Sequence, residues 1–122
     1  MPQTTGDDIE SRLLDFAVRI IRVCDALPRK PAAKHIRDQL LRSGTAPAPN
    51  YAEARAAESR RDFVHKLRVA MKELNETRVW LTMIVRAGFV PTERLRPVSD
   101  ECEQLCRVIG KSIQTASTKI RR

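Results

Sequence analysis

Long apolar runs are missing from this sequence, and so are the motifs of the common enzyme classes. No apolar stretch approaches the ~18 residues of a membrane-spanning helix, so no membrane segment is expected. A Gly-rich phosphate loop, a Gly-x-Ser-x-Gly elbow and a His-Glu-x-x-His pair are all absent. These absences argue against an enzyme, and no catalytic residue is predicted.

Candidate metal ligands are equally scarce. The three cysteines are an odd number without a recognisable secretion signal, which predicts reduced thiols in a cytoplasmic protein. Cys102 and Cys106, four apart, share a helix face, but zinc needs two further ligands and neither histidine has metal-ligand spacing. Glu73 and Glu76 lack the Glu-x-x-His step of carboxylate metal sites, so we expect them to form salt bridges or hydrogen bonds at a bundle or subunit boundary. No metal and no cofactor is predicted.

Acidic residues are too few to balance the basic ones. Lysine and arginine number 23 against 15 aspartates and glutamates, a net charge of +8, and residues 29–72 alone hold eleven basic and four acidic residues, or +7. Such an excess favours a polyanion, most commonly nucleic acid, although a basic surface without any partner is the alternative. The few aromatics are not interleaved with basic residues, so we expect contact with phosphates rather than with stacked bases. The predicted nucleic-acid-binding residues are Arg37, Arg60, Arg61, Lys66, Arg68 and Lys72.

The stretch from Ser59 to Gly88 predicts one long helix. Ser59 followed by Asp62 is a capping pattern, and Gly88 can adopt the left-handed conformation that ends a helix. Apolar or small residues recur between them at alternating steps of four and three, which predicts a heptad seam facing a core. These residues are Phe63, Leu67, Ala70, Leu74, Thr77, Leu81 and Ile84.

Three more helices are predicted, over residues of about 7–27, 31–57 and 92–121, with the long helix at 59–88. The residues from Met1 to Gly6 are expected to be a short polar arm. Four helical patterns with short connections in 122 residues predict one domain, an antiparallel up-down-up-down four-helix bundle. Pro47 and Pro49 predict a kink in the second helix, whose small residues could let it pass close to a neighbour; two separate helices are the alternative.

The helices predicted at residues 7–27 and 59–88, the first and third in chain order, carry more apolar residues than one core seam requires. Leu14 and Ile21 widen the first stripe, while Val64, Met71 and Val85 form a second row in the third helix. Apolar rows of this width must meet other surfaces, and a closed homo-oligomeric ring is one symmetric way to cover them. The pattern itself does not count the subunits.

Several stretches resemble the bacterial four-helix bundle family encoded within 23S ribosomal RNA intervening sequences. The resemblance is strong from Gln39 to Leu81 and rests above all on a Ser-x-x-Asp-Phe piece and a Lys-Glu-x-x-Glu-Thr-x-x-Trp-Leu piece. The chain departs from the usual pattern between Gly44 and Pro49. The matching stretches are Leu41–Ser43, Asn50–Ala54, Glu58–Leu67 and Ala70–Leu81.

The resemblance implies a cytoplasmic bundle that assembles as a homopentamer and has no established catalytic residues. It also implies a relation to the accessory variability proteins of diversity-generating retroelements, which bind nucleic acid and a reverse transcriptase through a basic surface. Two functional hypotheses follow. The first is an oligomeric module that binds the phosphate backbone of RNA or DNA, and the alternative is a protein-interaction scaffold or accessory subunit for a reverse transcriptase.

Overall fold

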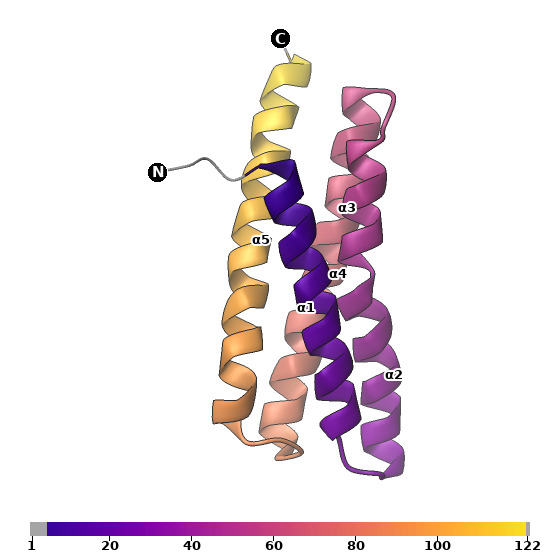
Figure 1. The fold of residues 1–122 in the computed structure, drawn as a ribbon, viewed down its shortest axis with the longest axis vertical. Helices are drawn as coiled ribbons and strands as arrows, with labels where there is room; N and C mark the ends of the chain where they lie inside the picture. The colour runs from indigo at the N-terminus through magenta and orange to yellow at the C-terminus, as the bar shows by residue number, and fades with distance from the viewer. Residues whose placement is uncertain (1–4, 122) are drawn as a thin grey trace.

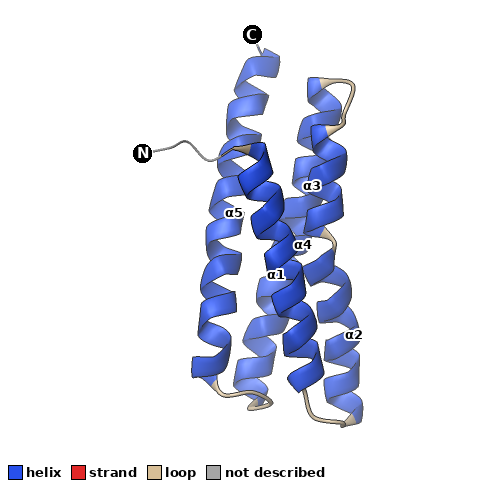
Figure 2. Cartoon of the chain, viewed as in Figure 1, coloured by secondary structure: helices blue, strands red, loops and turns tan. Residues whose placement is uncertain are grey.

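A computed structural model describes residues 5–121 as an antiparallel four-helix bundle (Figure 1). α1 packs on α2, α3 and α5, and α4 packs on the same three segments, so α1 and α4 occupy opposite corners of the bundle. Within the described residues there is no strand (Figure 2), and the predicted fold is confirmed. The helices are α1 (Gly6–Ala26), α2 (Pro31–Thr45), α3 (Pro47–Arg55), α4 (Arg60–Ala87) and α5 (Thr92–Arg121).

Local capping sets the ends of the helices. In α4, Ser59 Oγ accepts a hydrogen bond from Asp62 N at 3.0 Å and Gly88 ends the helix at φ 72°, both as predicted. In α1, Thr5 Oγ1 accepts from Asp8 N at 3.1 Å while Thr5 N donates to the Asp8 carboxylate at 3.0 Å, a complete capping box. The prediction of a polar arm is therefore wrong for Thr5 and Gly6, and residues 1–4 lie outside the described part of the chain.

α2 and α3 are two segments of one bent rod, which confirms the predicted kink. Ala46, between them, keeps helical dihedral angles of φ −74° and ψ −34°. The main-chain hydrogen bonds of the helix are interrupted here because Pro47 and Pro49 have no N–H to donate to the carbonyls one turn earlier. Asn50 secures the bend, since its main-chain N and its Nδ2 both donate to Ala46 O, at 3.2 and 2.9 Å. Gly44 lies just before the bend, where the backbone of α2 packs directly against the side chain of Ile20 of α1.

The core runs along the bundle axis and contains the predicted seam of α4. Six seam residues are buried and the seventh, Phe63, is half-buried at the upper end. Each fully buried leucine in this seam contributes about 1.5–3 kcal/mol through the removal of apolar surface from water. The two buried polar residues of the core pair with each other: the hydroxyls of Ser43 and Thr77 are hydrogen bonded at 2.9 Å, and Thr77 Oγ1 also donates to Glu73 O at 2.8 Å.

Two apolar patches stay exposed. Leu14, Val18 and Ile21 follow one another along α1 with 42–54% exposure, and Leu41 of α2, 40% exposed, lies on the side of that helix that faces α1. We call these four residues the α1–α2 apolar patch.

The second exposed patch lies on the opposite corner of the bundle. Val79 and Met83 of α4 are 41% and 42% exposed and line a hollow with Ile36, and these three residues are called the α4 apolar patch. The predicted second row of this helix is directed inward instead: Val64 is buried, while Met71 and Val85 are half-buried against the core. The apolar surplus of α4 is therefore near its C-terminal end.

None of the helices within the described residues combines the length and the apolar character that crossing a membrane requires.

Candidate nucleic-acid interface

Four of the six predicted nucleic-acid-binding residues lie exposed on the N-terminal half of α4. Arg61, Arg68 and Lys72 are spaced seven and four residues apart, so they share one face of the helix over roughly 16 Å at 1.5 Å per residue. Arg60 is exposed beside them. None of the four forms a salt bridge within residues 5–121, so their charges are available to a ligand. These four residues are called the α4 basic face.

The remaining two predicted residues are used inside the molecule. Lys66 pairs with Glu53 of α3 at 2.8 Å, which ties the two helices together. Arg37 donates to three main-chain carbonyls at the end of α1 and in the turn after it, Cys24 O at 3.2 Å, Leu27 O at 3.4 Å and Pro28 O at 3.2 Å. A cation here satisfies carbonyls that the helix end leaves unpaired and complements the negative end of the helix dipole.

We expect replacement of Arg37 by methionine to weaken folding rather than nucleic-acid binding. The substitution keeps most of the aliphatic stem and removes all three charged hydrogen bonds, so the free energy of unfolding should fall by about 1.5–3 kcal/mol. Urea denaturation followed by circular dichroism measures the change. Arg29→Met in the same turn is the matched control and should stay within about 0.5 kcal/mol, because Arg29 is exposed. Equal effects of the two substitutions would contradict this role.

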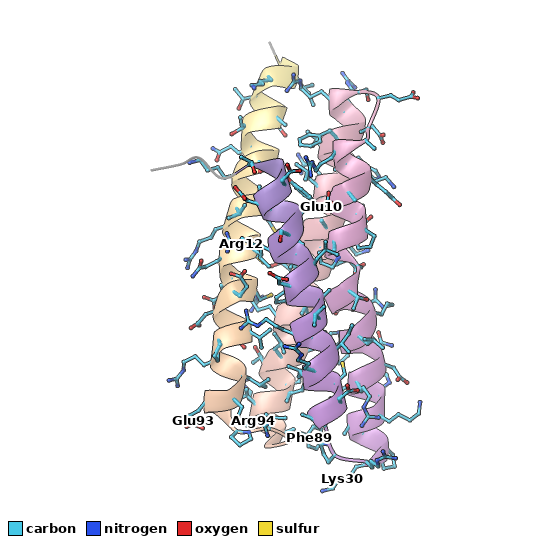
Figure 3. The ribbon with its side chains drawn as sticks, in the orientation of Figure 1. Glu10, Arg12, Lys30, Phe89, Glu93 and Arg94 are labelled. Carbon is cyan, nitrogen blue, oxygen red and sulfur yellow. The ribbon has the colours of Figure 1, made fainter. Side chains whose placement is uncertain are left out.

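A second basic cluster, not among the residues predicted from the sequence, lies between α1 and α5. A cavity of about 210 Å³ is lined by Arg19, Arg22 and Arg94 together with an apolar wall. Figure 3 shows Arg94 at the base of the bundle, where α5 begins beside the end of α1. Among residues 5–121 these three arginines form no salt bridge. The wall consists of Val23, Ala26, Val90, Leu95, Pro97 and Val98.

The predicted carboxylates Glu73 and Glu76 form salt bridges, as expected. Arg42 of α2 reaches across to both, at 3.0 Å from Glu73 and in closer contact with Glu76. Trp80 Nε1 also donates to Glu76 at 3.2 Å, and the Trp80 ring packs edge-on against His35 at 6.0 Å between ring centres. The cluster links α2 to α4. Within the described residues no group of three or more His, Cys, Asp or Glu side chains is placed to hold a metal ion.

The three cysteines differ in reactivity because their surroundings differ. Burial raises the pKa of Cys24 to about 11. Cys102 is fully buried, and its thiol donates to Leu74 O at 3.4 Å. A hydrogen bond from Cys102 to the Cys106 thiolate, once that thiol ionises, raises the pKa of Cys102 together with burial. The same hydrogen bond lowers the pKa of Cys106 to about 7, and the Arg78 guanidinium acts in the same direction. Cys106 is therefore the thiol that forms a thiolate at neutral pH.

We expect iodoacetamide to alkylate Cys106 fastest, with a rate that rises with pH through about 7. Replacing Cys102 by alanine removes the hydrogen-bond donor, so the midpoint should move upward toward the value of about 8.5 of a free thiol. Mass spectrometry of the labelled peptides over a pH series measures both midpoints. Cys106→Ser should abolish the fast phase; an unchanged midpoint in Cys102→Ala would contradict the pairing of the thiols.

The comparisons with known proteins agree with the helical fold. The family model described as 23S rRNA-intervening sequence protein matches residues 8–111. The chain is also similar to the crystal structure of a protein of unknown function from the S23 ribosomal protein family of Bacteroides thetaiotaomicron, with a TM-score of 0.81 and 32% sequence identity. That match covers 86% of this chain and 97% of the other. No curated protein matches the sequence. With most of its length matched and the same helical fold, the chain belongs to the 23S rRNA-intervening sequence protein family.

Proposed function

We propose that the protein is a non-enzymatic, cytoplasmic, oligomeric bundle that binds nucleic acid by its phosphate backbone. The observation that carries the proposal is the α4 basic face, where Arg60, Arg61, Arg68 and Lys72 present unneutralised charge to solvent. Cations spaced along one helix face suit a linear polyanion, because several phosphates can be contacted at once. Of phenylalanine, tyrosine and tryptophan, residues 60–72 contain Phe63, which packs against the core, so contact with phosphates supplies the binding rather than base stacking.

RNA is the first ligand to test, because the family is described by a ribosomal RNA element. We expect RNA and DNA of equal length to bind with similar affinity, since phosphate contacts carry little sequence information. Binding should weaken steeply between about 50 mM and 200 mM salt, because the release of condensed counterions gains less entropy when the solution already holds more salt.

Charge reversal on the α4 basic face tests the proposal. We expect the triple variant Arg61→Glu/Arg68→Glu/Lys72→Glu to lose more than about tenfold in affinity and to reduce the salt slope by about 2, at 0.7 for each phosphate contact with a single strand. Mobility-shift titrations at both salt concentrations measure the loss. The matched control is Arg96→Glu/Arg107→Glu/Lys111→Glu on α5, which changes net charge equally at exposed positions interspersed with Asp100 and Glu103.

The absence of any shift with the unaltered protein at low salt would contradict nucleic-acid binding. A protein scaffold, for a partner such as a reverse transcriptase, would then be favoured if a pull-down survives nuclease treatment. An equal loss in the α4 and α5 triple variants would contradict the assignment to the α4 basic face.

We further propose that the protein assembles as a homo-oligomeric ring, with five subunits as the family resemblance implies. The α1–α2 apolar patch and the α4 apolar patch are centred on helices at opposite corners of the bundle, and apart from the half-buried Ile36 their residues are about 40–54% exposed. Two different patches on different faces suit a head-to-tail contact, which closes into a ring when the rotation between neighbours allows it. Sedimentation equilibrium of the purified protein measures the number of subunits.

A further inference from the structure

The cleft between α1 and α5 continues beyond the cavity that Arg19, Arg22 and Arg94 line. A second hollow of about 400 Å³ adjoins it, and Arg19 and Arg22 line both. The two together form a groove from the base of the bundle toward its middle, where Arg12 of α1 pairs with Glu101 of α5 at 2.7 Å. We call this the α1–α5 groove.

The charge in the groove is uneven. We call the cavity of about 210 Å³ at the base of the bundle the lower cavity and the adjoining one of about 400 Å³ the upper hollow. No carboxylate lines the lower cavity, whereas Asp15 and Glu101 line the upper hollow and Arg12 neutralises Glu101. The lower cavity therefore has three cations without an intramolecular partner in the described part of the chain. Guanidinium groups there are well suited to phosphate oxygens, which they contact through two parallel hydrogen bonds.

The opposite lining of the lower cavity is apolar. Val23 of α1 lines the hollow together with Val90, in the turn before α5, and with Leu95 and Val98 at the start of α5, and the hollow opens beside the arginines. A ligand matched to this surface has an anionic group joined to a flat or apolar body. At about 210 Å³ the cavity is smaller than the roughly 300–1,000 Å³ of sites that enclose a whole small-molecule ligand, so it suits one unit of an extended chain.

We propose that the α1–α5 groove binds an unpaired segment of nucleic acid, with phosphates on Arg19, Arg22 and Arg94 and one unstacked base against the apolar wall. This inference rests on the proposed function and adds to it a second site and a preference for single strands. A duplex keeps its bases inside the stack, so it can contact the α4 basic face but cannot place a base in the cavity. The lower cavity shares no residue with either apolar patch, whereas Val18 of the α1–α2 apolar patch lines the upper hollow. Head-to-tail contacts through the patches therefore leave the lower cavity, where the base is placed, lined as in the single chain.

The test compares a short single-stranded oligonucleotide with a blunt hairpin duplex, each fluorescently labelled and titrated into the full chain. We expect Arg22→Gln/Arg94→Gln to weaken single-strand binding by about tenfold or more and to lower its salt slope by about 1.4, two contacts at 0.7 each. Duplex binding should change less than twofold. The matched control is Arg96→Gln/Arg107→Gln on the outer face of α5, which should leave both ligands unaffected.

A second variant tests the apolar part of the site without altering charge. Ala26 is exposed at the rim of the lower cavity, so Ala26→Trp should block the space for a base while the fold, checked by thermal unfolding, stays intact. We expect a selective loss of single-strand binding with an unchanged salt slope.

The outcomes separate this inference from the proposed function. Failure of the unaltered protein to bind either ligand at low salt would contradict both. Binding that is lost in the α4 triple variant but unchanged in Arg22→Gln/Arg94→Gln and in Ala26→Trp would overturn the groove alone. Equal losses for single strand and duplex in the groove variants would also overturn it.

Discussion

Replacement of Gly44 by alanine is expected to lower the free energy of unfolding by about 2 kcal/mol, although alanine is the better helix former. An added Cβ would stand 2.6 Å from Ile20 Cγ2 and 2.8 Å from Ile20 Cγ1, well inside contact distance. Ile20 is fully buried and branched at Cβ, so it has no free rotamer in which to move away. Because the neighbour cannot move, the cost of overpacking is expected at the upper end of its usual range, about 3 kcal/mol, and the propensity gain of about 1 kcal/mol leaves a net loss of about 2 kcal/mol. Thermal unfolding should show a fall in midpoint of roughly 5–10 °C.

Gly110 provides the matched control for this prediction. Its added Cβ would meet only Met71 Cε, at 3.2 Å, which is the far end of a flexible side chain. Gly110→Ala should therefore be neutral or stabilise the protein by up to about 1 kcal/mol. A double-mutant cycle completes the test: Ile20→Ala removes both clashing atoms, so Gly44→Ala should cost at least about 1 kcal/mol less in that background. Equal effects of Gly44→Ala in both backgrounds would contradict a steric origin.

The same contact explains what the sequence could and could not predict about the second rod. Pro47 and Pro49 lack the N–H that the ladder needs, so a kink was predictable from residue chemistry alone. The neighbour against which the bend packs was not, because Ile20 lies 24 positions earlier in the chain. Single-helix signals of the same kind, such as Ser59 and Gly88, were predictable because capping depends on residues a few positions apart.

The candidate sites likewise divide into features set by residues a few positions apart, which could be predicted, and features set by contacts between distant segments, which could not. Arg61, Arg68 and Lys72 could be predicted as one surface because a helical repeat places them on one face. The partners of Arg37 and Lys66 lie on other segments, so spacing could not reveal that these two charges are used internally. The α1–α5 groove needed one further step. An up-down bundle places the start of its last helix beside the end of its first, and this topology alone would have brought the region of Arg94 toward that of Arg22.

The second large effect is expected at the apolar patches. Val18→Glu in the α1–α2 apolar patch and Met83→Glu in the α4 apolar patch should each convert the assembled protein to monomers at micromolar concentration. A carboxylate buried in an interface without a partner costs several kcal/mol, which corresponds to a loss of more than about a hundredfold in affinity at each contact. Sedimentation velocity measures the change, and Gln104→Glu at an exposed position of α5, which contributes to neither patch, is the control for added charge.

Mixing the two variants distinguishes a ring from a symmetric dimer. In a head-to-tail contact the α1–α2 apolar patch of one subunit meets the α4 apolar patch of the next, so each variant keeps one intact half of the interface. An equimolar mixture should therefore form a heterodimer and stop there, because both outer patches carry the substitution. In a two-fold symmetric contact a patch pairs with the same patch of the partner subunit. The variant whose substitution lies in the other patch would then remain dimeric alone, and mixing the two variants would produce no new assembly. A mixture that stays monomeric would contradict the head-to-tail arrangement, since the two intact patches would then have failed to recognise each other.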